Sequence, residues 1–337
     1  MAEKTYREAI IEAMAEEMRR DERVVLIGED VGRFGGAMGA SKGLFQEFGP
    51  SRVIDTPISE AAIIGSALGM ALTGLRPIAE LMFIDFAGVC MDQITNQVAK
   101  VRYMLGGQVS VPVVVRTQAG AGKGYAAQHS QSLEAWFTHI PGLKVVMPAT
   151  ARDAKGLLKS SIRDDNPVLF IEHKLLYNVK GDVPEDPDFL IPLGVAEVKR
   201  EGSDLTFVSH SRQVLNCLEA ADELAAQGID AEVIDLRTLR PMDFSVVQAS
   251  VEKTGRLVTV EEGYPQCGIG AEVVARVAER CLDSIDMPPI RITSKDTPIP
   301  FAQVLEQETL PSPRRIVETV LAARRWGRGP QDQRLAV

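Results

Sequence analysis

Apolar residues recur at helical spacing at the start of the chain and form short uninterrupted runs after it. Over residues 5–20 they return every three or four positions, and Thr5 and Glu8 have the spacing of a capping box, so the pattern predicts an amphipathic helix. Runs rich in β-branched residues over 23–27 and 52–55 predict the first two strands.

Glycine marks the next two segments. Six glycines within 28–43 exclude regular structure there and predict a flexible or functional loop. A helix is predicted over 59–73, with Ser59 as its N-cap, and after its first acid it is apolar on every side, which is typical of a helix surrounded by protein. Gly65 and Gly69 share one face of this helix and predict close contact with another subunit or domain.

Strand-like and helical patterns then alternate in two series. The first has strands near 77–84, 111–116, 144–147 and 168–172 and helices near 87–104, 131–139 and 151–164. The second has strands near 205–209, 231–235, 257–261 and 290–293 and helices near 212–227, 270–282 and 312–325. The alternation predicts two three-layer α/β domains with parallel sheets, spanning 1–180 and 195–326, with a proline-rich linker over 181–194 and a frayed tail over 327–337.

Composition narrows the class of protein. With 337 residues, 45% of them hydrophobic and 25% charged, the chain is expected to be globular and to form more than one domain. A net charge of −9 argues against nucleic acid as a partner. The four cysteines form no CxxC pair, which argues against a zinc site or a disulfide framework and fits a reducing cytoplasm. No secretory signal or long uncharged apolar run is present, so no membrane association is expected.

The glycine-rich segments do not match the common nucleotide-binding motifs. Glycines 32, 35, 36 and 39 do not give GxGxxG, and Gly120, Gly122 and Gly124 give GxGxG instead. A P-loop around Lys123 is excluded because Thr117 and Gly124 stand where glycine and a hydroxyl residue are needed. Both segments remain either connectors or functional loops.

Two residues are candidates for chemistry. The four histidines lack the spacing of a metal centre, and His139 is expected to be structural, but His129 follows the strand predicted over 111–116, where open α/β sheets bind ligands. A neutral imidazole there transfers protons near neutral pH, and the alternative is a satisfied loop histidine. Glu60 is an acid in the first turn of an apolar helix, where it either complements the helix dipole or pairs with a ligand nitrogen.

Four long segments resemble one known family. They are DTPISEAAIIGSALGMALTGLRPIAELMF, AAQHSQSLEAWFTHIPGLKVVMPAT, DAKGLLKSSIRDDNPV and VEEGYPQCGIGAEV. In this order and spacing they are similar to the beta subunit of the thiamine-diphosphate-dependent first component of 2-oxo acid dehydrogenase complexes, over residues 4 to about 325. The resemblance implies a transketolase-like pyrimidine-binding domain followed by a transketolase-type C-terminal domain.

The resemblance also implies roles for residues around the cofactor. Glu60 matches the glutamate that bonds the pyrimidine nitrogen and favours the imino tautomer, which deprotonates the reactive thiazolium carbon. Ile58 and Phe86 match residues that line the aminopyrimidine pocket, and Glu29 matches an acid between paired active sites, although loop acids are often only solvated. His129 matches the active-site histidine that assists substrate addition and acyl transfer to lipoamide.

The resemblance also implies a cation site. Val113, Ser161, Asp164 and Asn166 fall where the family binds potassium, mainly through backbone carbonyls. An ordinary strand and helix-end turn is the alternative.

The absence of one family motif from the sequence bears on which subunits this chain needs as partners. No GDG with a downstream asparagine occurs, and that motif is how the family holds the magnesium carrying the diphosphate. The resemblance therefore implies a separate alpha subunit, a heterotetramer containing a second beta subunit, and docking to a lipoyl acyltransferase core.

Two of the segments also bear on the substrate. The segments HIPGLKVVMPAT and IEHKLLYNVKGDVP look most like the acetoin-cleaving branch, so acetoin is expected, with pyruvate and then a branched-chain 2-oxo acid as alternatives. Two rival hypotheses are a self-sufficient transketolase-like enzyme and a noncatalytic subunit that docks the acyltransferase.

Overall fold

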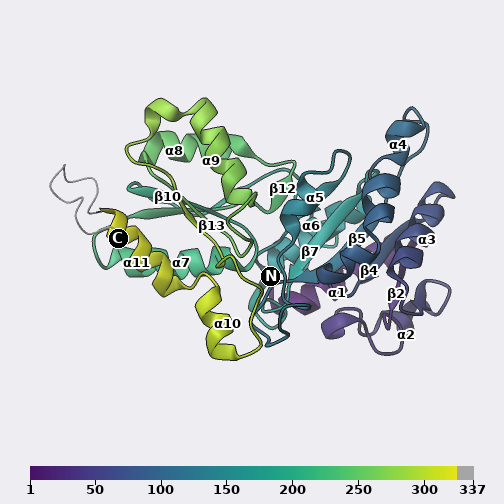
Figure 1. Cartoon of the computed structure of the whole chain (residues 1–337). Helices are drawn as coiled ribbons and strands as arrows, with labels where there is room; N and C mark the ends of the chain where they lie inside the picture. Colours follow the sequence, from purple (N-terminus) through teal and green to yellow (C-terminus); the bar gives the residue numbers. More distant parts are fainter. Residues whose placement is uncertain (325–337) are drawn as a thin grey trace. The chain divides into compact units, whose positions relative to one another are not determined.

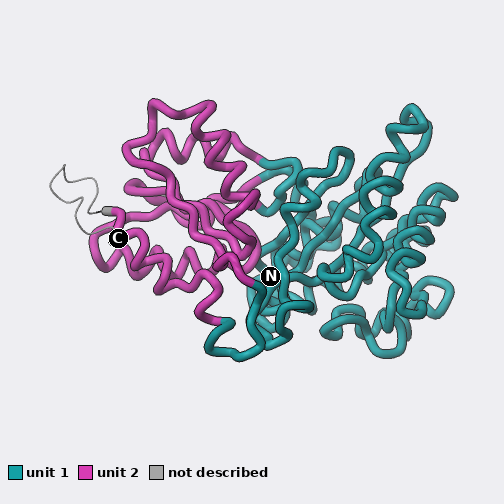
Figure 2. The backbone as a smooth tube through the Cα atoms, viewed as in Figure 1, with its two compact units in different colours: residues 1–195, 237–242, 298–306 teal, residues 196–236, 243–297, 307–337 magenta. Residues whose placement is uncertain are grey.

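The computed structural model describes residues 1–324, so the tail predicted over 327–337 lies outside the described residues. Figure 2 shows two compact units. The first contains Met1–Val195 together with two later segments, Arg237–Met242 and Pro298–Glu306. The second contains Ala196–Leu236, Asp243–Thr297 and the chain from Gln307 onward. The expected two-domain α/β architecture is confirmed, and the two returning segments were not predicted.

The first unit is built on a seven-stranded sheet (Figure 1) in the order β12-β6-β7-β5-β4-β2-β3. Its strands are β2 (Val24–Glu29), β3 (Val53–Thr56), β4 (Arg76–Leu81), β5 (Val114–Ala119), β6 (Lys144–Val146), β7 (Val168–His173) and β12 (Thr238–Arg240). All pair in parallel except β12, which runs antiparallel to β6. Strands β5 and β7 are buried along their whole length, as in a sheet covered on both faces. The carboxyl ends of β2, β4, β5 and β7 therefore meet at one edge.

The helices of this unit follow the prediction in part. They are α1 (Tyr6–Arg20), α2 (Leu44–Phe48), α3 (Glu60–Leu72), α4 (Val101–Met104), α5 (Glu134–Thr138), α6 (Ala151–Arg163) and α10 (Gln303–Thr309), whose last residues belong to the second unit. The capping box of α1 is present: Glu8 N–H donates to the Thr5 hydroxyl and Thr5 N–H donates to the Glu8 carboxylate.

One helix prediction was wrong, and another was confirmed for the position of its N-cap but not for a capping bond. The helix expected over 87–104 is divided into a 3₁₀ segment, η2 (Ile84–Val89), a π-helical segment, η3 (Gln93–Val98), and α4. The Thr95 hydroxyl donates to the Met91 carbonyl and Lys100 Nζ donates to the Thr95 carbonyl, so side chains compete with the regular helical ladder there. Ser59 occupies the N-cap position of α3 but makes no side-chain capping bond.

Helix α3 is not enclosed on every side within this chain. It contacts β4, η2 and η3, and its residues Ile63, Ile64 and Ala67 are buried. Its opposite face, which carries Ala61, Ala62, Ser66 and Leu72, is exposed. The apolar pattern alone does not distinguish burial by this chain from burial by a partner.

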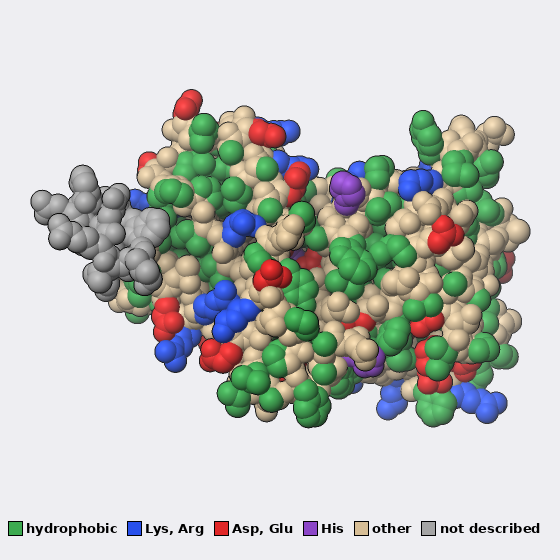
Figure 3. All heavy atoms as spheres, viewed as in Figure 1, with side chains coloured by type: hydrophobic (Ala, Val, Ile, Leu, Met, Phe, Trp, Pro, Cys, Tyr) green, Lys and Arg blue, Asp and Glu red, His purple; other side chains and the backbone are tan. Residues whose placement is uncertain are grey.

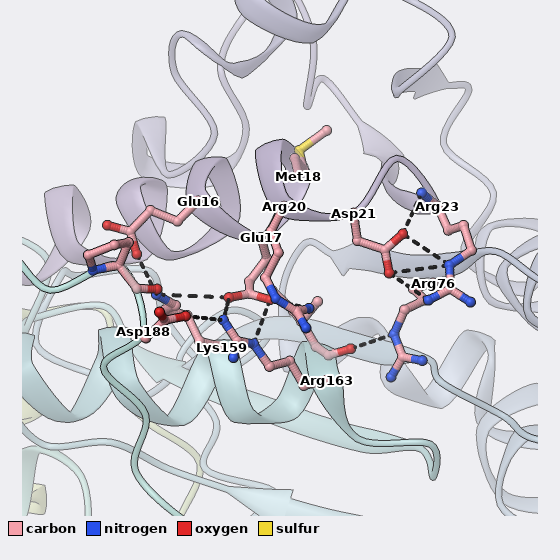
Figure 4. Close-up of polar contacts among 12 residues, drawn as sticks. Glu16, Glu17, Met18, Arg20, Asp21, Arg23, Arg76, Lys159, Arg163 and Asp188 are labelled. Carbon is pink, nitrogen blue, oxygen red and sulfur yellow. Dashed lines mark hydrogen bonds and ion pairs between the residues drawn. The ribbon is translucent and has the colours of Figure 1, made fainter.

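A ladder of ion pairs joins α1 to α6 (Figure 4). Lys155 and Lys159 of α6 are fully buried, and their ammonium groups bond Glu16 of α1 at 2.8 and 2.5 Å. Arg163 bonds Glu17 at 2.7 Å. The same two lysines donate to the carbonyls of Pro184 and Pro187. The segment expected to be a linker is therefore fastened to the first unit.

The start of that segment is ordered by a strand pair. The strand β8 (Lys180–Val183) pairs antiparallel with β1 (Ala2–Thr5) in a two-stranded sheet. Ile191, further along the segment, is buried. Proline and acid content disrupts helical and strand periodicity, but it does not prevent a segment from packing.

A buried charge cluster lies across three neighbouring strands of the large sheet. Arg116 of β5 donates through Nη1 to Glu80 of β4 at 2.7 Å and through Nη2 to Glu172 of β7 at 3.0 Å. All three side chains are fully buried. The Tyr177 hydroxyl also donates to Glu172. Burial raises the pKa of Glu80 against the opposing effect of Arg116, and the charge of Glu172 raises it further.

The second unit has a five-stranded sheet in the order β14-β13-β10-β11-β9. Its strands are β9 (Glu197–Arg200), β10 (Leu205–Ser209), β11 (Ala231–Asp235), β13 (Leu257–Val260) and β14 (Ile290–Ile292), of which only β9 is antiparallel to its neighbour. Its helices are α7 (Arg212–Ala225), α8 (Phe244–Thr254), α9 (Ile269–Arg280) and α11 (Pro313–Arg324), with a 3₁₀ turn η4 (Leu282–Ser284). The strands and helices expected in this half are present, and β9 and α8 are additional.

The molecular surface is mixed in character. On the face drawn in Figure 3, apolar side chains lie among charged and neutral polar ones. Within residues 1–324, no helix is both long and apolar enough to cross a membrane.

Candidate functional site

Two of the predicted acids lie at the same edge of the large sheet. Glu29 is the last residue of β2, and Glu60 is the first residue of α3, which follows β3. Burial raises the pKa of the Glu29 carboxyl, and the charges of Asp30 and Glu60 raise it further. Glu60 is half-buried rather than buried, and within the described part of the chain its carboxylate has no hydrogen bond or ion pair. It is therefore a carboxylate available to a ligand.

Cys90 connects this acid to the aromatic part of the site. Burial raises the pKa of the Cys90 thiol to about 12, with a further contribution from the negative charge of Glu60. The Cys90 Sγ lies 3.9 Å from the carbonyl oxygen of Phe86, one helical turn earlier in η2. Glu60 and Phe86 are therefore both close to Cys90.

Aromatic rings surround His129. Its ring centroid lies 5.3 Å from that of Phe86 and 6.0 Å from that of Phe83, and Phe83 in turn stacks on Tyr125 at 6.2 Å. His129 Nδ1 lies 2.6 Å from the Gln128 carbonyl oxygen. When Nδ1 carries the proton and donates to that oxygen, Nε2 keeps its lone pair and can accept a proton.

The loop that carries His129 is anchored at several points. Its glycine-rich start is held by Glu306 of α10, whose fully buried carboxylate accepts the N–H groups of Gly122 at 2.7 Å and Gly124 at 3.1 Å. At its other end, Asp85 accepts the backbone and side-chain N–H groups of Gln131 at 3.1 and 3.0 Å. The GxGxG segment is thus neither a nucleotide motif nor a free connector, and its glycine N–H donors bind a carboxylate of the same chain.

The loop over 28–43 is ordered in a similar way. The Gly32 N–H donates to Asp55 at 2.6 Å, and the Ala37 N–H donates to Glu80 of the buried charge cluster at 2.7 Å. It includes a short 3₁₀ turn, η1 (Ala37–Gly39). This loop leaves β2 directly after Glu29, so its anchors also define where Glu29 lies.

Other predicted site residues are placed as follows. Ile58 is 73% exposed in this chain, two residues before Glu60. His139 lies at the C-cap of α5 and is exposed, so it has no buried structural role.

The four residues of the possible cation site surround the turn before β7. The Val113 carbonyl accepts the Val168 N–H, and the Ser161 carbonyl accepts the Asp164 N–H. The Asp164 carboxylate bonds Lys144 and Asn166, and the Asn166 side chain accepts from Arg102. Within residues 1–324, no group of three or more histidine, cysteine or acidic side chains is arranged to hold a metal. Any cation at this turn would depend on backbone carbonyls.

Sequence reasoning missed three anchors of the site. Lys174, Asp85 and Glu306 hold the His129 loop, and each is separated from it by many residues or lies in an unremarkable sequence context. The one available signal was a lysine directly after the strand predicted over 168–172, in the segment IEHKLLY.

Comparison with known proteins agrees with this architecture. The family model described as "Transketolase, pyrimidine binding domain" matches residues 2–180, and "Transketolase, C-terminal domain" matches residues 194–316. A solved structure described as "Split gene transketolase, inactive beta4 tetramer" has a TM-score of 0.77 and 26% identity, and the match covers 95% of this chain and 97% of that one.

Curated relatives are more similar in sequence. The chain is 52% identical to "Pyruvate dehydrogenase E1 component subunit beta" of Rhizobium meliloti, over 96% of this chain and 70% of the relative. It is also 52% identical to "Acetoin:2,6-dichlorophenolindophenol oxidoreductase subunit beta" of Bacillus subtilis, over 93% of this chain and 95% of the relative. The chain therefore belongs to the family of beta subunits of the thiamine-diphosphate-dependent first component of 2-oxo acid dehydrogenase complexes.

Proposed function

We propose that this chain forms the half-site that binds the pyrimidine ring of thiamine diphosphate in an acetoin-cleaving dehydrogenase component. The observation that carries the proposal is the unpaired carboxylate of Glu60, which lies close to Glu29 and, through Cys90, to the aromatic group of Phe86 and His129. A carboxylate that accepts from a ring nitrogen, with an aromatic face beside it, matches the chemistry of an aminopyrimidine.

Each residue has a separate task in this proposal. When bound, thiamine diphosphate supplies a nucleophilic thiazolium carbon that adds to the carbonyl of the substrate. Glu60 holds a proton between its carboxylate and the pyrimidine nitrogen, and Phe86 and Ile58 orient the ring. His129 accepts or donates a proton through Nε2 as the substrate adds and as the acyl group leaves. Glu29 is the acid proposed to lie between paired active sites, and burial raises its pKa.

The other half of the site is assigned to a separate alpha subunit. The chain lacks the GDG motif, so the magnesium and the diphosphate are proposed to be held by that subunit. The exposed face of α3, with its small residues Ala61, Ala62 and Ser66, is the proposed contact of this subunit with a neighbour in a heterotetramer of two alpha and two beta chains. Docking to a lipoyl acyltransferase core and potassium at the turn before β7 belong to the same proposal.

Acetoin is preferred to pyruvate because the segments HIPGLKVVMPAT and IEHKLLYNVKGDVP look most like the acetoin-cleaving branch. Overall identity is 52% to each of the two bacterial relatives and does not separate the two substrates. A cytoplasmic location is also proposed, and it is supported by four cysteines that are all free thiols.

The test is turnover by the chain reconstituted with its alpha subunit, with 2,6-dichlorophenolindophenol as electron acceptor. Acetoin is expected to give the highest kcat/KM, above pyruvate and the branched-chain 2-oxo acids. A pyruvate preference would reassign the substrate within the family. Absence of turnover with every substrate would support a noncatalytic docking subunit, and turnover by the isolated chain would support a self-sufficient enzyme.

A further inference from the structure

Lys174 is a fully buried lysine beside the predicted catalytic histidine. It follows the last residue of β7, and its backbone N–H extends the sheet by donating to the Ala119 carbonyl at the end of β5. Its side chain is 0% exposed. The lysine therefore lies at the carboxyl edge of the sheet, beneath the loop that runs from Gly120 to Gln131.

The ammonium group of Lys174 binds both ends of that loop. Its Nζ donates to the His129 carbonyl at 2.7 Å and to the Gly120 carbonyl at 3.2 Å. It also lies 4.6 Å from the centre of the Phe83 ring and 4.0 Å from Asp85 Oδ2. Phe83 contacts His129 directly, and Asp85 binds Gln131, two residues further along the loop.

A buried ammonium group such as that of Lys174 destabilises the folded protein unless nearby groups bind it. An ammonium taken out of water carries a desolvation penalty that close partners must offset, and here two carbonyls, a carboxylate and an aromatic face provide them. Because both bonded carbonyls belong to the loop, displacement of the loop would cost the buried charge two hydrogen bonds. The charge therefore holds the backbone of His129 in one position.

The position of that backbone determines where the imidazole lies. His129 is in a segment without helix or strand, so no secondary structure fixes its Cα. Its ring is in contact with Phe83 and Phe86, and Phe83 also lies against the lysine. We propose that Lys174 is a positioning residue for His129, which it holds in register with the reacting carbon of the substrate. This inference rests on the proposed function, in which His129 transfers the proton.

A double-mutant cycle on the reconstituted alpha-beta pair tests the inference. Lys174→Met is expected to lower kcat roughly 10- to 100-fold, because misplacement of a reacting group by about 1 Å costs up to about 100-fold. In a His129→Ala background the same change is expected to lower kcat by less than about twofold, because the group that Lys174 positions is already absent. If the two losses multiply instead, Lys174 acts independently of His129 and the inference is wrong.

Amide hydrogen exchange of the isolated chain provides a readout other than activity. Lys174→Met is expected to speed exchange in peptides covering residues 120–131 and to leave those of α7 and α8 unchanged. Unchanged exchange in the loop would overturn the inference. If the methionine variant does not fold, Lys174→Arg is used in the same cycle, because it keeps the charge but cannot place one nitrogen between both carbonyls.

The outcomes separate this inference from the function on which it rests. An inactive wild-type pair contradicts the proposed function. An active wild-type pair with independent losses contradicts only the role of Lys174.

Discussion

Replacement of Arg116 by methionine tests whether the buried charge cluster stabilises the large sheet. Arg116 is the single cation between Glu80 and Glu172, and all three side chains are fully buried. The charges of Glu172 and Glu80 raise the pKa of Arg116 well above its ordinary value, although burial alone would lower it. Methionine fills a similar volume but leaves two carboxylates in the interior without a counterion.

The magnitude follows from the burial of the group. Removing one partner of a buried ion pair costs about 3–5 kcal/mol. For a folding unit of 150–250 residues, about 2–4 °C of melting temperature is lost per kcal/mol, so the variant should melt roughly 6–20 °C below the wild type. Thermal unfolding of the chain at pH 7, followed by circular dichroism, measures this difference.

Two control variants separate charge from packing. Lys159→Met also removes a fully buried cation, but Glu16 keeps Lys155 and Glu17 keeps Arg163, so the loss should be only about 1–3 kcal/mol. Arg116→Met combined with Glu80→Gln and Glu172→Gln removes the uncompensated charges and should recover much of the lost stability. A melting temperature for Arg116→Met equal to that of the wild type would refute this reasoning.

Three other predictions follow from the same geometry. The folded-state pKa of Glu80 is raised above its ordinary value of 4.5, so folded chains hold a proton that unfolded chains release, and stability should fall as pH rises from about 4.5 through the raised pKa. Urea unfolding at several pH values measures this slope, and Glu80→Gln should reduce it. An unchanged slope in the variant would contradict the assignment. Gly120→Ala should lower turnover at least about 10-fold, because the added Cβ would lie 2.1 Å from His173 Nε2 at a residue whose φ is +91°. The control Gly181→Ala should leave turnover unchanged, because the nearest atom to its added Cβ lies at 3.9 Å. Equal effects of the two variants in kinetic assays would argue against the loop geometry. Brief alkylation with iodoacetamide at pH 8 should modify the exposed Cys267 before Cys90 and Cys217, both buried with pKa values of about 12, and mass spectrometry showing Cys90 modified first would be inconsistent with its burial.

Local patterns in the sequence predicted the local structure well. Thr5 and Glu8 form the capping box expected from their spacing, and apolar runs became the buried strands β5 and β7. These features depend on residues within a few positions of each other. The same is true of the alternation of strands and helices that predicted both sheets.

Long-range features were not predictable from those patterns. Glu80, Arg116 and Glu172 read as isolated charges in three strands, and only the strand order β7-β5-β4 makes them neighbours. Glu306 anchors the loop at Gly122, which lies 184 residues earlier in the chain. Sequence spacing carries no information on which distant strands become adjacent.

The site was predictable in part for the same reason. Glu60 and His129 were candidates from their local sequence context, and Glu29 was identified through family resemblance. Glu29 and Glu60 lie at the carboxyl edge, in agreement with the rule for open α/β sheets. The burial of Glu60 was overestimated, because the apolar pattern of α3 also reflects a face that is exposed in the single chain.

Exchange of the thiazolium C2 proton of thiamine diphosphate with solvent deuterium tests directly whether Glu60 activates the cofactor. NMR would compare the reconstituted alpha-beta pair with its Glu60→Gln variant. Loss of an acid or base in such a proton transfer typically costs about 10²–10⁴-fold, so the variant should bind the cofactor and exchange its C2 proton at least about 100-fold more slowly. Exchange at the wild-type rate in the Glu60→Gln variant would contradict the central claim that this carboxylate activates the cofactor.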